Sequence, residues 1–114
     1  MDLYNELQIK INELNVSLKK LRETGTSYAE AERDYKITLR QEALKLRSEK
    51  EMPVTLIQQV VYGVPEVAEK RFKRDVALTI YEANREAIQT IKLQIKIIQT
   101  QLDKEWSIAS KENM

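Results

Sequence analysis

The residues that interrupt helices are gathered in one short part of this 114-residue chain. Both prolines, Pro53 and Pro65, lie there together with Gly63, and no charged residue stands between Met52 and Pro65. Proline lacks a backbone N–H and disfavours helical geometry at the residue before it, so helices end or begin at these positions. Two long helical arms joined by a short connection are therefore expected.

The first arm has the periodicity of a coiled coil. Apolar residues recur at alternating spacings of four and three, which places them on one stripe of a helix. They are Leu7, Ile11, Leu14, Leu18 and Leu21, and the same register continues at Tyr28, Tyr35, Leu39 and Leu46. Gly25 also falls on the stripe and can end a helix, while Ser27 and Glu30 have capping-box spacing. We expect two helices, residues 1–24 and 27–50, joined by a kink at Gly25, with a tight turn as the alternative.

The connection, residues 51–64, is expected to hold a short helix. Thr55 can cap a helix from Leu56 to Tyr62, which Gly63 would close. This apolar helix would plug the end of the two arms; the alternative is an exposed apolar tip that binds a partner.

Pro65 suits the first turn of a helix, and no glycine or proline follows it. We therefore expect a very long last helix over residues 65–110, with a tail at 111–114. Its predicted apolar stripe comprises Val76, Ile80, Ala83, Ala87, Ile91, Ile95, Ile98 and Leu102. The predicted fold is all-α, a long antiparallel helical hairpin formed by one domain.

The last helix also carries apolar residues away from this stripe, namely Leu93, Ile97 and Trp106. A helix that is apolar on more than one side requires a second partner. A slender hairpin can bury such a side against a copy of itself, most often with two-fold symmetry. We expect a homo-oligomeric helical bundle joined through these three residues; their partial exposure is the alternative.

The chain has no His and no Cys, which removes imidazole bases, thiolate nucleophiles and the usual zinc ligands. Glycine-rich phosphate loops and nucleophile elbows are absent as well. We expect no enzymatic activity, no metal and no cofactor. No stretch approaches the roughly 20 apolar residues of a membrane span, and the first residues lack the pattern of a signal peptide. A cytoplasmic protein without a membrane partner is expected.

Basic residues gather near the connection. Between Arg33 and Asp75 there are ten basic and seven acidic residues, although the formal net charge of the chain is only +1. Several of these cations lie at the start of the last helix, where the helix dipole does not favour them. An external anion, such as a nucleic-acid backbone or a nucleotide phosphate, could compensate them; pairing with carboxylates of the chain is the alternative. The candidate residues for an anion or a partner are Arg40, Arg47, Lys70, Arg71, Lys73 and Arg74.

Two segments and the total length resemble a group of small helical proteins encoded among the early genes of temperate phages of Gram-positive bacteria. The segments are GTSYAEAERDYKITLRQEALKLR and MPVTLIQQVVYGVPEVAEKRFKRDVALTIYEANREAIQTIKLQIKIIQTQLDKEW. The resemblance implies a phage product in the cytoplasm of the bacterial host, where such proteins block host factors or assist DNA processing.

Two functions are therefore considered. The first is an interaction protein that antagonises a bacterial host or defence factor by occluding a surface or sequestering a ligand such as a nucleotide. The second is a nucleic-acid-binding accessory of phage recombination or replication. The balanced net charge favours the first, because non-specific binding of nucleic acid depends on phosphate neutralisation.

Overall fold

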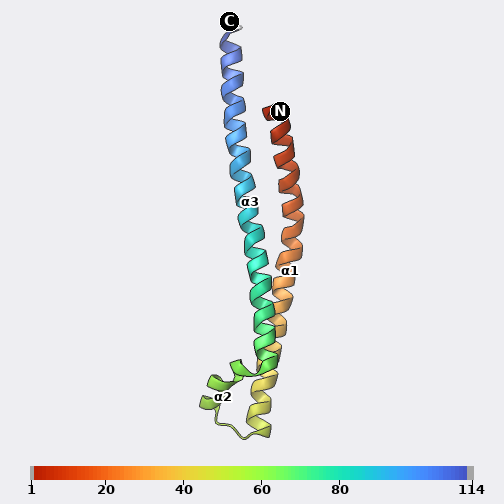
Figure 1. Ribbon diagram of the computed structural model, residues 1–114, viewed down its shortest axis with the longest axis vertical. Helices are drawn as coiled ribbons and strands as arrows, with labels where there is room; N and C mark the ends of the chain where they lie inside the picture. Colours follow the sequence, from red (N-terminus) through yellow and green to blue (C-terminus); the bar gives the residue numbers. More distant parts are fainter. Residues whose placement is uncertain (1, 113–114) are drawn as a thin grey trace. The chain divides into compact units, whose positions relative to one another are not determined.

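The computed structural model describes residues 2–112, which form three α-helices and one short 3₁₀ helix, without any strand (Figure 1). In chain order they are α1 (Leu3–Glu49), α2 (Val54–Val60), the 3₁₀ helix η1 (Val61–Gly63) and α3 (Pro65–Glu112). The predicted all-α helical hairpin, with a short connecting helix and a very long last helix, is confirmed.

The chain divides into two compact units. One combines residues 1–22 with residues 82–114 and is termed the arm unit; the other comprises residues 23–81 and is termed the turn unit. Within each unit α1 and α3 run antiparallel, and the turn unit also contains α2 and η1 (Figure 1).

α1 is one continuous helix of 47 residues, so the predicted end of a helix at Gly25 is wrong. Gly25 does not have a positive φ, and Ser27 lies inside the helix instead of capping a new one. A Cβ at Gly25 would lie 3.4 Å from Cε1 of Tyr81, an ordinary van der Waals contact, so this ring lies beside the α1 backbone without requiring glycine there. The ring of Tyr81 also stacks on that of Tyr28, with centroids 6.1 Å apart.

The two ends of α1 are closed by different means. At the start, Oδ1 of Asp2 accepts a hydrogen bond of 2.8 Å from the Asn5 amide, which is an N-cap. At the other end, Glu51 takes a positive φ of 54° and the Met52 amide donates to the carbonyl of Leu46 at 3.2 Å. This reversal leads the chain directly into α2.

α2 begins two residues earlier than predicted, at Val54, with Pro53 as its N-cap. The amides of Leu56 and Ile57 both donate to the Pro53 carbonyl at 3.0 Å. Thr55 therefore lies inside the helix, and its predicted role as a cap is wrong because a backbone carbonyl already accepts from the first amides.

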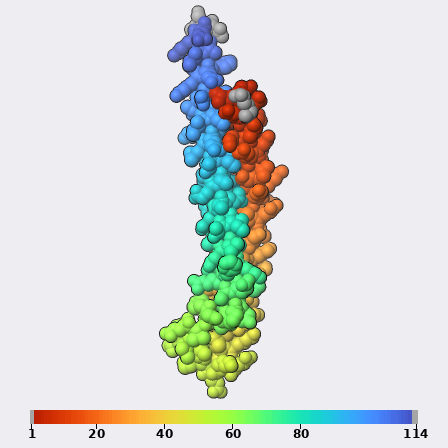
Figure 2. All heavy atoms as spheres, viewed as in Figure 1, coloured from red at the N-terminus to blue at the C-terminus, as the bar shows by residue number. Residues whose placement is uncertain are grey.

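One side of α2 and η1 is buried in the core of the turn unit and the other side is exposed. The buried core consists of Tyr35, Ile57, Val61 and Val67, with Leu39, Ala43, Leu46, Met52 and Val64 packed against it. The exposed apolar side chains are Val54, Leu56, Val60 and Tyr62. Figure 2 shows these two helices standing out from the side of the turn unit. The segment is thus buried on one side, as expected of a helix that covers the end of the arms, and its other side is exposed; binding of a partner there stays a prediction.

α3 has 48 residues and begins at Pro65, as predicted. It extends through Glu112 instead of ending at residue 110, and residues 113–114 of the predicted tail lie outside the described residues. Its buried and half-buried residues recur every three or four positions along its length. They include Val67, Lys70, Arg74, Ala77, Tyr81, Asn84, Ile88, Ile91, Ile95, Ile98 and Leu102.

The predicted stripe of α3 is therefore right for its last four members and wrong for the others. Val76, Ile80, Ala83 and Ala87 are exposed. The reason is that the seam of α3 includes polar residues, which a search for apolar side chains alone passes over. A strict seven-residue repeat continues through them and keeps one face of the helix toward α1.

In the arm unit the seam is mainly aliphatic. Ile88, Ile91 and Ile98 of α3 are buried, and α1 contributes the half-buried residues Leu7, Ile11, Leu14 and Leu21. Leu18, which was predicted on the same stripe, is exposed, so this member of the prediction is wrong. Asn84 lies in this seam and its Nδ2 donates to the backbone carbonyl of Ser17 at 3.1 Å. A polar seam residue with one fitting acceptor favours a single register of the two helices.

Candidate interaction site

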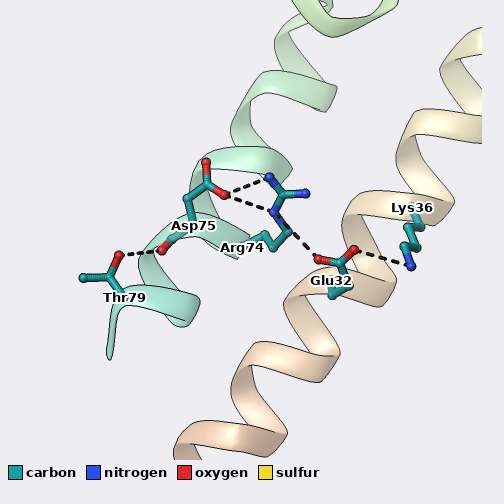
Figure 3. A network of polar contacts seen from close by, with 5 residues as sticks. All are labelled: Glu32, Lys36, Arg74, Asp75 and Thr79. Atoms are coloured by element: carbon teal, nitrogen blue, oxygen red, sulfur yellow. Dashed lines mark hydrogen bonds and ion pairs between the residues drawn. The ribbon is translucent and has the colours of Figure 1, made fainter. Parts of the chain in front are cut away.

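The centre of the predicted basic cluster is Arg74, which belongs to the seam of α3 (Figure 3). Its guanidinium lies over the ring of Tyr35, 4.5 Å from the centroid. Its Nη2 and Nε donate to Oδ1 of Asp75 at 2.8 and 3.0 Å, and Nε lies 3.7 Å from Oε2 of Glu32. The hydrogen bond to Asp75 is the main cause that raises the pKa of Arg74, and burial opposes it.

Glu32 connects this pair to a second cation. Its Oε1 lies 3.5 Å from Nζ of Lys36, one turn further along α1, and Figure 3 shows the carboxylate between the two cations. Glu32 occupies a seam position of α1, four residues after Tyr28 and three before Tyr35. This spacing could have identified it from the sequence, because a charged residue in a coiled-coil seam requires a partner.

Three further candidates also have partners inside the turn unit. The guanidinium of Arg71 lies 5.7 Å from the centroid of the Tyr62 ring, and Nζ of Lys73 lies 3.9 Å from Oε1 of Glu69. Nη1 of Arg47 donates to the carbonyl of Met52 at 3.1 Å, where it supports the reversal after α1. Each of these three cations thus has a contact inside the turn unit, and that of Lys73 is with a carboxylate.

The remaining two candidates, Arg40 and Lys70, form no hydrogen bond or ion pair with another of the residues 2–112. They lie in different surroundings. Lys70 is half-buried in the seam of α3, whereas Arg40 is exposed on α1 beside a groove.

This groove lies between α1 and the connecting helices and has a volume of about 550 Å³. It is here termed the α1–α2 groove. Its lining is mainly apolar, with Lys36 and Arg40 as its only charged residues. The full lining consists of Lys36, Ile37, Leu39, Arg40, Ala43, Ile57, Gln58, Val61 and Tyr62.

A second apolar surface of the turn unit lies on α3. Phe72, Val76 and Ile80 are exposed at helical spacing and line a groove of about 380 Å³, with Glu23 and Ser27 on the α1 side. Val76 and Ile80 were predicted to lie on the apolar stripe that faces the other arm, so this surface was not predicted. Its signal in the sequence is that these residues lie outside the seven-residue repeat of the seam.

The three predicted interface residues lie on the surface of the arm unit. Leu93, Ile97 and Trp106 are 63%, 65% and 77% exposed. Ile97 also lines a shallow groove of about 440 Å³ with Lys96, Thr100, Gln101 and Lys104. These side chains are therefore accessible to a partner, and no contact within the arm unit covers them.

Residues 2–112 contain no group of three or more acidic side chains placed to hold a metal ion. None of the described helices combines the length and apolarity needed to cross a membrane. Comparison of the chain with models of protein families, with curated proteins and with solved structures found no match.

Proposed function

We propose that this chain is a non-enzymatic interaction protein whose partner is another protein. The observation that carries the proposal is the contrast between its charged and its apolar side chains. Four of the six candidate cations, Arg47, Arg71, Lys73 and Arg74, contact groups of the turn unit itself. Large apolar side chains, in contrast, are exposed on α2, η1 and α3.

Nucleic-acid binding is the weaker candidate on the same grounds. A phosphate backbone is bound by several cations that are free to replace its counterions. Arg74 would have to leave Asp75, Glu32 and the ring of Tyr35 before it could serve a phosphate. An exposed apolar surface, by comparison, is typical of a site that binds protein.

The biological setting of this proposal rests on the resemblance to early phage proteins. In that setting the partner is a bacterial host or defence factor, and the chain antagonises it by occluding its surface. Sequestering a ligand such as a nucleotide is the variant of the same function. The site of action is then the cytoplasm of the bacterial host.

Self-association is the second part of the proposal. Leu93 and Ile97 lie four residues apart on an exposed face of α3, as they would in a helix-to-helix contact. A copy of the same chain offers the same apolar face, and a two-fold axis pairs such faces. We propose a homo-oligomer joined through this face and Trp106.

The test is affinity capture from a bacterial lysate with the full chain, in parallel samples with and without nuclease. The proposal expects a specific protein that survives nuclease and binds the chain again after both are purified. Loss of every captured protein on nuclease treatment would support the nucleic-acid function instead. Mass spectrometry of small molecules released on denaturation tests the ligand-sequestering variant.

The non-enzymatic part has its own test. Purified chain is incubated with nucleotides and with single- and double-stranded nucleic acid, and no turnover is expected. Turnover that disappears when one carboxylate is changed would contradict this part of the proposal.

A further inference from the structure

The α1–α2 groove has one charged rim and one neutral wall. The neutral wall is formed by α2 and η1, which belong to a segment without any charged residue between Met52 and Pro65. The charged rim is formed by α1, through Lys36 and Arg40. The surface thus offers apolar contact along its length and positive charge along one edge.

The positive edge extends along α1 beyond the groove itself. At about 100° per residue, Arg33, Lys36 and Arg47 fall within roughly 40° of Arg40 on the helix circumference. Lys45 lies on another side of the helix, and no carboxylate of residues 33–47 falls within about 60° of Arg40. The residues of this face are Arg33, Lys36, Ile37, Arg40, Leu44 and Arg47. The two apolar members, Ile37 and Leu44, are exposed among the cations.

The cations of this edge are incompletely neutralised by the chain. Arg40 forms no ion pair with another of the residues 2–112. Arg33 forms an exposed ion pair of 3.2 Å with Asp34, and Lys36 forms one of 3.5 Å with Glu32, whose carboxylate also lies beside Arg74. A partner that brings carboxylates to this edge would therefore gain charge complementarity that the free protein lacks.

From this arrangement we infer that the α1–α2 groove binds an acidic amphipathic helix of a partner protein. The inference rests on the proposed protein-binding function and specifies the chemistry of its partner. Apolar residues of the partner at positions i, i+3 or i+4, and i+7 enter the groove, in the helix-in-groove mode. Asp or Glu residues on the edge of that helix face Arg40 and Lys36.

The size of the groove agrees with such an occupant. Its α1 wall runs from Lys36 to Ala43, about 10 Å at 1.5 Å per residue. This length accommodates about two turns of a partner helix, which present three apolar anchors on one side. A phosphate backbone fits less well, because the floor and the α2 wall offer it neither charge nor hydrogen-bond donors beyond Gln58 and Tyr62.

The experiment is a selection on the full-length chain with displayed 16-residue segments of bacterial proteins as the probe. We expect the enriched segments to be helical, acidic and apolar at the i, i+3 or i+4, and i+7 positions. Enrichment of basic or irregular segments, or of none, would overturn the inference.

The affinity of the best segment is then measured by fluorescence anisotropy with two groove variants. Lys36→Glu combined with Arg40→Glu should weaken binding about tenfold, since two exposed pairs together contribute about 1.4 kcal/mol. Ile37→Ser should weaken it about as much. These side chains are exposed, so the helical circular dichroism of both variants should match that of the wild type.

The matched control for charge is Lys19→Glu combined with Lys20→Glu, which changes the net charge equally in the arm unit. This control should keep the affinity within about twofold, whereas equal losses in both double variants would reduce the effect to net charge and contradict the inference. Saturable binding of a DNA duplex or of phosphatidylserine vesicles that is lost in the variant Lys36→Glu with Arg40→Glu would show that this edge binds phosphate groups, and would contradict the inference.

The two proposals can fail separately. A captured bacterial protein that binds the groove variants as tightly as the wild type leaves the interaction function standing and overturns the groove as its site. Groove-dependent binding of acidic helices without any captured protein supports the site chemistry and counts against the function in the lysate tested.

Discussion

Changing Glu32 and Arg74 should show that their attraction to each other contributes little net stability, and that Arg74 contributes more through its contacts with Asp75 and Tyr35. At the observed 3.7 Å, an effective dielectric constant of about 20 gives an attraction of roughly 4.5 kcal/mol. The side chain of Arg74 is 21% exposed and that of Glu32 is 26% exposed, so solvent screens the pair. The partial desolvation of both charges also opposes the attraction. We expect a coupling free energy of about 1 kcal/mol between them.

The single variants should differ because Arg74 has more contacts than Glu32. Arg74→Met also loses two hydrogen bonds to Asp75 and the contact with the Tyr35 ring, and should destabilise the fold by about 2 kcal/mol. Glu32→Gln leaves those contacts in place and should cost about 1 kcal/mol. The double variant Glu32→Leu with Arg74→Met places apolar groups at both seam positions and should lie within about 1 kcal/mol of wild type.

The assay is urea unfolding, monitored by circular dichroism at several salt concentrations. It compares the wild type, Glu32→Gln, Arg74→Met and the variant that combines both changes. The variant Glu32→Leu with Arg74→Met is measured in parallel. Because the pKa of Arg74 is raised, its contribution is fully present below the ordinary arginine pKa and is lost only above it. Titration of Arg74 should therefore change nothing between about pH 6 and 9. A coupling below about 0.3 kcal/mol would show that the pair is an exposed contact without a role in the seam. A coupling free energy above about 3 kcal/mol would show that the pair is a major source of stability and would contradict the small net contribution expected here.

Three further outcomes are expected. Glu51 has a positive φ, a backbone conformation that costs a non-glycine residue about 1 kcal/mol. Glu51→Gly should therefore raise the free energy of unfolding by about 1 kcal/mol and move the urea midpoint upward; an unchanged midpoint would contradict this cost. Gly25→Ala places its Cβ at 3.4 Å from Tyr81, an ordinary contact, and should stabilise the helix by up to about 1 kcal/mol, whereas Gly25→Leu should destabilise it; the same unfolding assay decides. Leu93→Glu combined with Ile97→Glu should lower the mass seen by light scattering and leave the helical signal intact, because both side chains are exposed; a wild type that is monomeric at tens of micromolar would refute the proposed homo-oligomer.

The hairpin could be predicted because its signals are local and unambiguous. The reversal follows from Pro53, Pro65 and the uncharged segment between them. The register of α1 follows from its four-and-three repeat, and Tyr28 and Tyr35 occupy the positions that this repeat assigns to them. Such features depend on backbone chemistry and on periodicity, which a sequence contains in full.

Gly25 was misinterpreted because its role depends on a residue far away in the chain. A glycine can end a helix or lie within one, and here α1 continues through Gly25 where Tyr81 of α3 packs beside it. The stripe of α3 was misplaced for a related reason. Asn84 and Arg74 belong to the seam because Ser17 and Glu32 meet them there, and apolarity alone gives no sign of it.

Composition located the basic residues near the connection but did not predict their arrangement. The charge count located the basic residues correctly near the connection, yet it could not distinguish Arg74, which is paired in the seam, from Arg40, which is not. The α1–α2 groove could not be seen at all, because it depends on which side of α2 faces α1. Pairing and concavity are properties of the fold.

The central proposal is that the basic residues of the turn unit stabilise the fold and contact a protein partner, and that they do not bind nucleic acid. Its most direct test is a fluorescence anisotropy titration of labelled single- and double-stranded DNA with the full chain at physiological salt. We expect no saturable binding up to tens of micromolar protein, either for the wild type or for the variant Arg71→Glu with Arg74→Glu. Saturable binding with a steep salt dependence, abolished in that variant, would contradict it and support the nucleic-acid function.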